Sequence, residues 1–528
     1  MVERILAING YWVKGATMTD QHINSDWIQK AATIRFETRA FIEGDYQVSK
    51  GKAIFTTVNP ATECELATFT DANPNSVDQA VAAARKAFGQ WRHVAPDQRK
   101  ALLLAVADRI DAERNTLALL DSLEMGMPIS MALEQVEGAA GFLRYNAELI
   151  DKVYGEIAPS DPATTLALSL PEPRGVIGII SPWNFPLLTA ILAIAPALAA
   201  GNTVVLKPSE LTHNTSTLVT EIIQTVFHED HVVSIEGGVS VATELLEQRW
   251  DYIFFTGSVP VGKIVAKAAA KHLTPVTLEL GGKSPCVVDS TIDLKLTAKR
   301  IVWGKLFNGG QTCISPDYII VHESVKKELI DCLKSEIIRA YGEHPFESVD
   351  YPKIIDKKNT ERLVSMLADV KIVHGGDFNI ENRYISPTII DNPGLDSKVM
   401  ATEIFGPVLP VLSYSEAADI DAIISHYEKP LSLYVFSKDR NFIDTMLSTY
   451  SFGGGAINDP LIHFGNHRLP FGGVGASGIG SYHGKHGFDT FSHHKSVSKR
   501  GTWIDPSIRY APYNNKLSLL KRMFKLLG

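Results

Sequence analysis

The sequence is poor in cysteine, and it lacks the long apolar run of a membrane-spanning helix. Its 528 residues include four cysteines: Cys64, Cys286, Cys313 and Cys332. None lies in a Cys-x-x-Cys or Cys/His ligand spacing, so we expect neither a disulfide framework nor a bound metal, and a reducing compartment is the natural setting. The most apolar segment, 187–200, is too short to span a bilayer.

An excess of either charge is also missing. The chain carries 51 Lys and Arg against 59 Asp and Glu, a net charge of -8 with both signs spread along the sequence. Nucleic-acid binding would require a basic face, so we expect no nucleic-acid partner. No basic segment followed by an apolar run stands at the beginning of the sequence, so no secretory signal is visible and a cytoplasmic protein is expected.

Composition and length are those of a globular protein with more than one domain. Hydrophobic residues make up 45% and charged residues 21% of the chain, which is ordinary for a soluble protein. A chain of 528 residues is too long for one hydrophobic core, so two or three domains are expected.

The middle of the sequence alternates short apolar runs with segments of helix length. Five runs read as buried parallel strands: Val176–Ile180, Thr203–Lys207, Val232–Glu236, Tyr252–Thr256 and Val276–Leu280. Helices are expected between them, near 186–200, 212–227, 240–247 and 260–271. The last helix has one apolar face: Val261, Ile264, Val265, Ala268 and Ala269. This alternation predicts an α/β fold with a doubly wound, Rossmann-type sheet.

Further elements are expected on either side of that sheet. Two amphipathic helices upstream, within 77–88 and 103–110, are predicted to cover it. After Gly282 a second alternation begins, with strands at Cys286–Asp289, Tyr318–His322, Tyr384–Ile390 and Leu431–Phe436 and helices near 293–307, 324–340 and 419–427. It predicts a second α/β domain, joined to the first through Glu279–Ser284.

Three side chains could together carry covalent chemistry on an aldehyde. Cys313 ends a glycine-rich loop, Glu279 precedes two glycines, and Asn184 lies between two prolines. A thiol attacks a carbonyl, a rigid amide holds the oxyanion, and a carboxylate activates water to release the acid. Each residue alone also has an ordinary interpretation, because a single cysteine is usually a core residue and an asparagine between prolines can form a local turn.

The thiol needs activation from outside its own segment. No His or Arg lies within five residues of Cys313. Tertiary contacts, a helix terminus near residue 308, or the positive ring of a cofactor would have to supply it. Cys286 and Cys332 read as buried packing residues.

Three other segments could contact a dinucleotide, although each also reads as ordinary structure. Gly257, Ser258 and Gly262 form a turn between a strand and a helix, where N–H groups can approach a phosphate. Lys207 and Glu210 follow a parallel strand at its carboxyl end, or form a solvated loop. From the residues alone, Glu403 would be interpreted as a charged residue at a helix end and Phe405 as a core residue.

Taken together, these motifs resemble the aldehyde dehydrogenase superfamily over about residues 38–510. The resemblance implies that Cys313 is the nucleophile, Glu279 the general base and Asn184 an oxyanion donor. It places Lys207 and Glu210 on the adenosine ribose, Glu403 on the nicotinamide ribose and Phe405 on the nicotinamide. Cofactor contacts are also implied for Trp183, Gly257, Ser258 and Gly262. Because a carboxylate at Glu210 favours a free 2′-hydroxyl, NAD is expected, with NADP possible.

The two parts of the chain resemble different branches of that superfamily. Residues 41–205 look like the long soluble aldehyde dehydrogenases, as in Val58–Thr62 and Asp151–Glu156. From 207 onward the chain resembles class 3 enzymes for fatty or aromatic aldehydes, as in Gln311–Tyr318 and Pro470–Gly478. This suggests a mosaic, and it implies medium- or long-chain aliphatic or aromatic aldehydes as substrates. His463 is a candidate for the mouth of the substrate channel.

The resemblance also implies domains and assembly. The expected divisions are an NAD-binding domain at 1–281 with a bridging, oligomerisation hairpin at 153–170, a catalytic domain at 282–480, and a segment at 481–528 that returns to the first domain and the dimer interface. The tail has an apolar helical face and basic charges: Leu517, Leu520, Phe524 and Leu527, with Lys516, Lys521, Arg522 and Lys525. We expect this tail to pack in a homodimer, and we favour a homodimer over a tetramer. Weak peripheral contact of the tail with a membrane is the alternative.

Three other functions remain open at this stage. A CoA-acylating member of the same fold would generally lack the general-base glutamate, which stands here as Glu279. A non-catalytic protein on this fold would not need Cys313, Glu279 and Asn184 together. A cysteine hydrolase would need a positioned histidine and no dinucleotide sheet.

Overall fold

A computed structural model of the protein describes most of the chain. The described residues are 27, 29–31, 33–34, 40–42, 45–47, 54–72, 74–153, 155–159, 165–228, 230–503, 505, 507–513 and 516–527. Two compact units result, Met1–Val153 with Pro173–Ser492 and Tyr154–Glu172 with His493–Gly528. Residues 1–26 of the predicted first domain, and the side chains of Phe524 and Leu527 in the predicted tail helix, lie outside the described residues.

The first sheet of the larger unit confirms the predicted doubly wound arrangement. Its strand order is β21 (Gly478–Ile479), β11 (Val276–Glu279), β10 (Tyr252–Thr256), β7 (Val176–Ile180), β8 (Thr203–Lys207) and β9 (Val232–Ser234). The five predicted strands are parallel to one another. Within this sheet the chain first forms β7, then adds β8 and β9 on one side of it, and then returns to add β10 and β11 on the other side. The direction in which strands are added therefore reverses between β7 and β10. Ligands of such sheets bind at the carboxyl ends of the strands beside this reversal.

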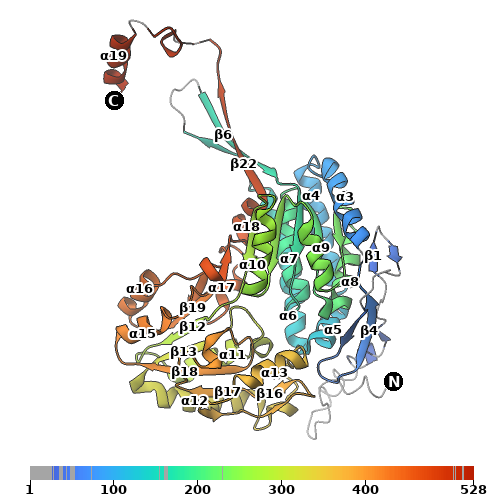
Figure 1. Ribbon diagram of the computed structural model, residues 1–528, viewed down its shortest axis with the longest axis vertical. Coiled ribbons are helices and arrows are strands. Elements are labelled where there is room, and N and C mark those ends of the chain that lie inside the picture. Colours follow the sequence, from blue (N-terminus) through green and yellow to red (C-terminus); the bar gives the residue numbers. More distant parts are fainter. Residues whose placement is uncertain are drawn as a thin grey trace. The chain divides into compact units, whose positions relative to one another are not determined.

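Helices cover both faces of this sheet because its strands are apolar on both sides (Figure 1). Alternate residues point to opposite faces. Ile177 and Ile179 pack in one core with α4 (Pro96–Ala112), α6 (Ile129–Ile150), α7 (Pro186–Ala199) and α8 (His213–Gln224). Val176 and Val205 pack in the other with α3 (Pro74–Trp91), α9 (Val239–Glu247) and α10 (Val259–Ala270).

One of the two helices predicted to cover the sheet lies further from it. Helix α3 contacts β7, β8 and β9, as expected. Helix α4 packs mainly on α6 and α7, and α5 (Arg114–Met125) packs on α6. On this face α7 contacts β7 and β8, and α8 contacts β9, so α4 belongs to a second helical layer.

The second sheet contains the other predicted alternation. Its order is β14 (Ile372–His374), β17 (Thr388–Asp391), β18 (Val408–Tyr414), β13 (Tyr318–His322), β12 (Pro285–Val288), β19 (Ser432–Phe436) and β20 (Gly454–Ile457). Around it lie α11 (Leu294–Leu306), α12 (Glu323–Tyr341), α13 (Lys357–Ser365), α15 (Ala417–Ile424) and α16 (Arg440–Thr449) (Figure 1).

The strand predicted at Tyr384–Ile390 is wrong as a single element. It divides into β16 (Tyr384–Ile385), paired only with β15 (Phe378–Asn379), and β17 in the large sheet. Pro387 lies between them. Because proline has no N–H to donate, it interrupts the ladder, and the chain changes partners there.

The chain returns to the first sheet after completing the second. Strand β21 pairs antiparallel with β11, which places Gly478 opposite Glu279. Helix α18 (Gly484–Thr490) then contacts α7, and the Phe491 ring lies 5.6 Å from that of Tyr252. This return covers the edge of the sheet beside Glu279.

The smaller unit is a three-stranded sheet followed by a helix. Strand β6 (Thr165–Pro173) lies between β5 (Glu156–Ala158) and β22 (Ser492–Arg500), and α19 spans Leu517–Leu527. Lys495 and Glu172 pair at 2.7 Å within it. Apolar side chains such as Ile157 and Trp503 are exposed on this unit.

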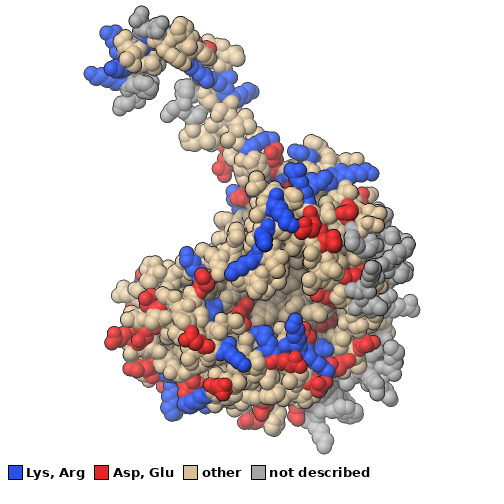
Figure 2. Space-filling view, viewed as in Figure 1, with Lys and Arg blue, Asp and Glu red and all other residues tan. Residues whose placement is uncertain are grey.

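Surface charge and hydropathy of the described residues agree with the composition. On the face drawn in Figure 2, Lys and Arg side chains are interspersed with Asp and Glu. Among the described helices, none combines the length and the apolar character that crossing a bilayer requires.

Candidate active site

The loop that carries Cys313 depends on an unusual run of backbone angles. After α11 ends at Leu306, Asn308, Gly309 and Gly310 have φ of 51°, 64° and 77°. A Cβ at Gly310 would overlap the carbonyl of Gly406, so both the angle and the space require glycine there. The chain then reaches Cys313, whose side chain is partly exposed.

Gln311 fixes this loop through its side chain. Its Nε2 donates to the carbonyl oxygens of Asn308 at 3.1 Å and Lys353 at 3.0 Å, and its Oε1 accepts from the N–H of Ile355 at 3.0 Å. These bonds are buried, so the loop is held in place in the absence of any ligand.

Asn184 is bonded directly to the cysteine loop. Its Nδ2 donates to the Gln311 carbonyl at 3.0 Å, and its own carbonyl accepts from Asn308 Nδ2 at 3.0 Å. Because Gln311 is 127 residues away, this bond is tertiary and does not form a local turn. An amide nitrogen carries two hydrogens, so this bond leaves one of them for a further acceptor.

The surroundings of Cys313 favour the thiol over the thiolate. The pKa of Cys313 is raised to about 12, mainly by burial and also by the charges of Glu403 and Glu279, while the N–H groups of Cys313 and Ile314 act in the opposite direction. The helix terminus expected near residue 308 is the carboxyl end of α11. Its dipole opposes a negative charge, so that expected source of activation is wrong.

Glu279 is a buried carboxyl group at the end of β11. Its strand lies between β10 and β21, and neither oxygen has a hydrogen-bond partner among the described residues. Burial raises the pKa of Glu279 well above its usual value. A carboxyl group in such a site is a stronger base than an exposed one once it loses its proton.

The segment with Glu403 and Phe405 lies against the hinge, by which we mean Glu279–Ser284, the segment that joins the two predicted domains. A Cβ at Gly281 would overlap the Glu403 carboxylate, so the missing side chain provides the space that this carboxylate occupies. Burial and the charge of Asp317 raise the pKa of Glu403 to about 8, while the Gly282 N–H lowers it. Phe405, at φ 48°, holds its ring 5.7 Å from that of Trp183 at an interplanar angle of 86°.

Lys207 and Glu210 meet at the carboxyl end of β8. Lys207 Nζ lies 3.1 Å from Glu210 Oε2 and donates to the Pro208 carbonyl at 2.8 Å. Lys207 is buried and the Glu210 carboxylate is partly exposed, so the pair can present an amine and a carboxylate oxygen toward a ligand at the strand ends.

The turn after β10 leads into a helix whose first N–H groups have no side-chain cap. Gly257 follows the strand, Ser258 takes the N-cap position of α10 without a capping bond from its side chain, and Gly262 is buried against Leu280. Such a terminus can receive an anion.

Part of the apolar face predicted for α10 lies outside the core. Val265, Ala268 and Ala269 are buried as expected, whereas Val261 and Ile264 are 43% and 59% exposed. These two side chains occupy the first turns of the helix, next to the uncapped terminus.

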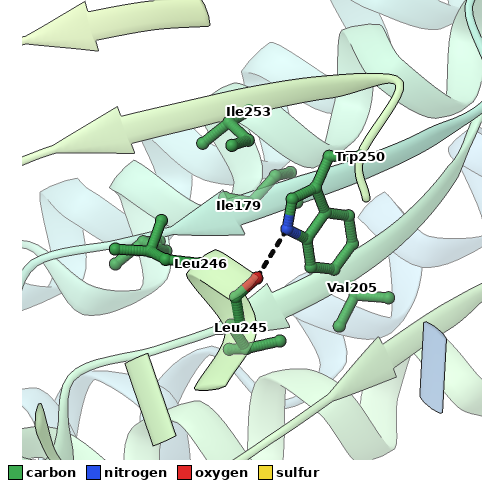
Figure 3. A pocket seen from close by; sticks show the side chains of 8 residues that line it. Ile179, Val205, Leu245, Leu246, Trp250 and Ile253 are labelled. Atoms are coloured by element: carbon green, nitrogen blue, oxygen red, sulfur yellow. Dashed lines mark hydrogen bonds between the residues drawn. The ribbon is translucent and has the colours of Figure 1, made fainter. Parts of the chain in front are cut away.

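Two cavities lie near these elements. One of about 380 Å³ is lined by Trp303, Phe307 and Tyr341 together with Glu134, Arg339 and Asp350. The Phe307 ring begins the cysteine loop and lies 6.0 Å from that of Phe185. The other, between the first sheet and α9 at Trp250 (Figure 3), has only about 10 Å³ and is too small for a ligand.

Sequence reasoning missed several contacts of the site. The roles of Gln311, of Lys283 and Asp317, and of Tyr434, whose hydroxyl donates to the Ile314 carbonyl at 2.7 Å, were not expected. Gln311 and Asp317 lie in the motif Gln311–Tyr318 and Lys283 lies in the connection Glu279–Ser284, so their place in these segments was the signal that could have indicated them. The other cysteines lie elsewhere, Cys286 buried as expected and Cys332 only partly buried.

The fold and the site define an oxidoreductase that combines a dinucleotide-type sheet with a loop-held thiol. The aldehyde dehydrogenase family matches residues 46–497, and the chain belongs to that family. It is therefore an aldehyde dehydrogenase with NAD(P) as cofactor.

Curated relatives and solved structures agree with this assignment. The 4,4'-diaponeurosporen-aldehyde dehydrogenase of Staphylococcus aureus is 47% identical over 67% of this chain and 78% of its own length. Aldehyde dehydrogenase family 3 member A2 of Macaca fascicularis is 46% identical over 67% and 75%. The substrate-bound AldH of Staphylococcus aureus superposes with a TM-score of 0.81 at 38% identity, covering 85% of this chain and 99% of that one. An indole-3-acetaldehyde dehydrogenase complexed with NAD+ gives 0.85 at 29% identity, covering 90% and 99%.

The contact between Gly281 and Glu403 makes a testable prediction. In Gly281→Ala the new methyl group would overlap the carboxylate and displace it, so we expect NAD to bind about tenfold more weakly, the cost of roughly one hydrogen bond. Gly282→Ala is the matched control, since its Cβ would meet its nearest atom at 3.5 Å. Isothermal titration calorimetry with NAD checks this, and equal affinities of the two variants would contradict it.

Proposed function

We propose that this chain oxidises an aldehyde to a carboxylic acid through a covalent thioester on Cys313. The observation that carries the proposal is the bond from the Asn184 amide to the Gln311 carbonyl, because it fixes Asn184 to the loop that carries Cys313 and uses only one of the two amide hydrogens. The buried, unpartnered carboxyl group of Glu279 supplies the base that thioester hydrolysis needs.

In the first step Cys313 attacks the aldehyde carbon. The S–C bond forms while the carbonyl π electrons move to oxygen, and the thiol proton passes to a base. Asn184 Nδ2 and the main-chain N–H of Cys313 are the donors for the oxyanion. Because Asn184 is already fixed by the loop, it needs little rearrangement to do so.

NAD(P), when bound, supplies the acceptor for the hydride that leaves the substrate carbon. Loss of that hydride leaves the acyl group on Cys313 as a thioester. Deprotonated Glu279 then takes a proton from water, the hydroxide attacks the acyl carbon, and the S–C bond breaks to release the acid and the thiolate.

The residues at the strand ends fit a dinucleotide. Lys207 and Glu210 offer a donor and an acceptor for ribose hydroxyls, and the uncapped terminus of α10 at Ser258 suits a phosphate. The exposed Val261 and Ile264 beside it offer apolar contacts to a base. On the other side, Glu403, Phe405 and Trp183 would hold the nicotinamide end.

Apolar aldehydes are the substrate class that we propose. The 380 Å³ cavity is lined by Phe307, at the start of the cysteine loop, and by Trp303, whose ring lies 5.8 Å from that of Phe307, while polar side chains form much of the remaining lining. The class 3-like motifs support the same assignment. His463 packs between Tyr434 and Phe471, and burial lowers its pKa to about 4, which favours a neutral packing role.

Assembly, location and ancestry remain proposals. We favour a cytoplasmic homodimer, supported by the exposed apolar residues of the smaller unit, such as Trp503 and Leu517. Peripheral membrane contact through α19 is the alternative. Domain divisions at 281 and 480 and a mosaic of two branches are proposed from the sequence motifs.

The two steps of the mechanism should fail separately in two variants. Cys313→Ala should bind NAD but form no NADH, while Glu279→Gln should give up to one NADH per site and then turn over at least about a hundredfold more slowly. Absorbance at 340 nm over the first turnovers measures both. Cys332→Ala, at a partly buried cysteine on α12, is the control. Steady turnover by Cys313→Ala would contradict the mechanism.

Deacylation should also depend on pH. Burial raises the pKa of Glu279, and only its deprotonated form can activate water. The hydrolysis rate should therefore increase as pH rises through that raised pKa, and this rise should be absent in Glu279→Gln.

Substrate preference tests the proposed substrate class. Medium-chain aliphatic or aromatic aldehydes should exceed acetaldehyde in kcat/KM, because their apolar surface is buried against Trp303 and Phe307. A panel of aldehydes with NAD, with and without CoA, measures this. The opposite ranking would refute the assignment, and a dependence on CoA would favour an acylating enzyme.

Cofactor preference tests the place of Glu210. Its carboxylate should repel a 2′-phosphate, so Glu210→Gln should raise the ratio of kcat/KM for NADP to that for NAD. Glu247→Gln, an exposed carboxylate paired with Lys271 on the neighbouring helices, is the control and should leave the ratio unchanged. An unchanged ratio in Glu210→Gln would place Glu210 away from the ribose.

A further inference from the structure

Two buried charged residues have no part in the mechanism above. Lys283 closes the motif that begins at Leu278, and Asp317 follows Cys313 by four residues. Lys283 Nζ lies 2.6 Å from Asp317 Oδ2, and the side chains are 6% and 4% exposed. Burying such a pair adds little stability, because the cost of desolvating both charges offsets their attraction. Stability therefore does not explain why these residues stand here.

Lys283 holds the main chain that leads to Glu403. Its Nζ donates to the carbonyl oxygen of Val399 at 3.0 Å and to that of Thr402 at 3.1 Å. The second carbonyl belongs to the peptide that joins Thr402 to Glu403. One ammonium group therefore fixes the approach to the carboxylate proposed to bind the nicotinamide ribose.

Asp317 holds the main chain on the other side of Glu403. Its Oδ1 accepts from the N–H of Ile404 at 3.0 Å, and its own N–H donates to the Ser284 carbonyl at 2.8 Å. Arg362 Nη2 donates to the Ile404 carbonyl at 2.9 Å. The pair thus joins the end of the cysteine loop, the hinge and the segment of Glu403 and Phe405.

A further cation, Lys305, lies near the Asp317 carboxylate. Lys305 is fully buried, and its Nζ has no hydrogen-bond partner among the described residues. Burial lowers the pKa of Lys305 to about 8, and Asp317 is the largest influence in the opposite direction. Asp317 would therefore keep a neighbouring amine if Lys283 were replaced, which makes the replacement a practical experiment.

We propose that Lys283 and Asp317 are a positioning pair for the oxidation, which set the place of Glu403 and Phe405 relative to the cofactor. The inference rests on the proposed function. Both residues act through the main chain of 399–404, and neither is assigned a contact with the reacting atoms. Their effect should therefore be seen in cofactor binding and in the C–H cleavage step.

Lys283→Met is the first test, because it removes two donors to the main chain and keeps an apolar stem of similar length. We expect calorimetry to show that this variant binds NAD about tenfold more weakly than the wild type. A loss of that size corresponds to one or two charge-assisted hydrogen bonds. With an aldehyde deuterated at the carbonyl carbon, the isotope effect on kcat should increase over wild type, since misplacement slows C–H cleavage.

A double variant separates positioning from stability. In Lys283→Met with Asp317→Asn, the new amide still offers an oxygen to Ile404, and no uncompensated carboxylate remains. Its Tm should equal or exceed that of Lys283→Met, because removing one partner of a buried pair costs more than removing both charges. The weaker NAD binding and the larger isotope effect should persist.

Lys326→Met is the matched control. Lys326 and Asp391 pair at 2.8 Å in the same unit, with side chains 16% and 19% exposed, and Asp391 also pairs with Lys371 at 2.6 Å. Among the described residues, no hydrogen bond joins Lys326 or Asp391 to 399–404. NAD affinity should stay within about twofold of wild type, as for a change distant from the site. Wild-type NAD affinity and isotope effect in either Lys283 variant would overturn the positioning role. A wild-type enzyme that forms no NADH would instead count against the proposed function.

Discussion

The bond from Asn184 to the Gln311 carbonyl is the interaction on which the site depends. Asn184 precedes α7 of the first sheet, and Gln311 lies in the loop after α11 beside the second. This bond and the bond from Asn308 to the Asn184 carbonyl therefore join the segment before α7 to the loop that carries Cys313. The loop accepts this arrangement because glycine and asparagine tolerate its positive φ angles, and because the Gln311 side chain bonds to the carbonyls of Asn308 and Lys353.

Burial gives the site its electrostatic character. Cys313, Glu279 and Glu403 all have raised pKa values, for which burial is the largest cause. The thiol is therefore the favoured form of Cys313, and a negative charge on either carboxyl group would favour it further. The proposed attack by Cys313 needs a base or a nearby positive charge to provide the thiolate.

Much of the fold could be predicted from the sequence, because parallel strands buried on both faces are continuous apolar runs. Five of the six strands of the first sheet were predicted to within two residues of their observed ends. Strand β21 was missed because two residues carry no periodicity, and Tyr384–Ile390 was read as one strand although Pro387 divides it. The motifs indicated Asn184, Glu279 and Cys313, but not the partners of Gln311, Lys283 and Asp317. Such partners come from segments far apart in the sequence and are brought together only by tertiary packing.

Identification of the acylated residue tests the central claim most directly. Glu279→Gln would be mixed with a medium-chain aldehyde and NAD, stopped with acid during the first turnover, digested and examined by mass spectrometry. The account predicts an acyl group on the peptide that contains Cys313, bound through sulfur and released by hydroxylamine, and none when NAD is omitted. An acyl group on Cys64, Cys286 or Cys332, or none on any cysteine while NADH is formed, would contradict it.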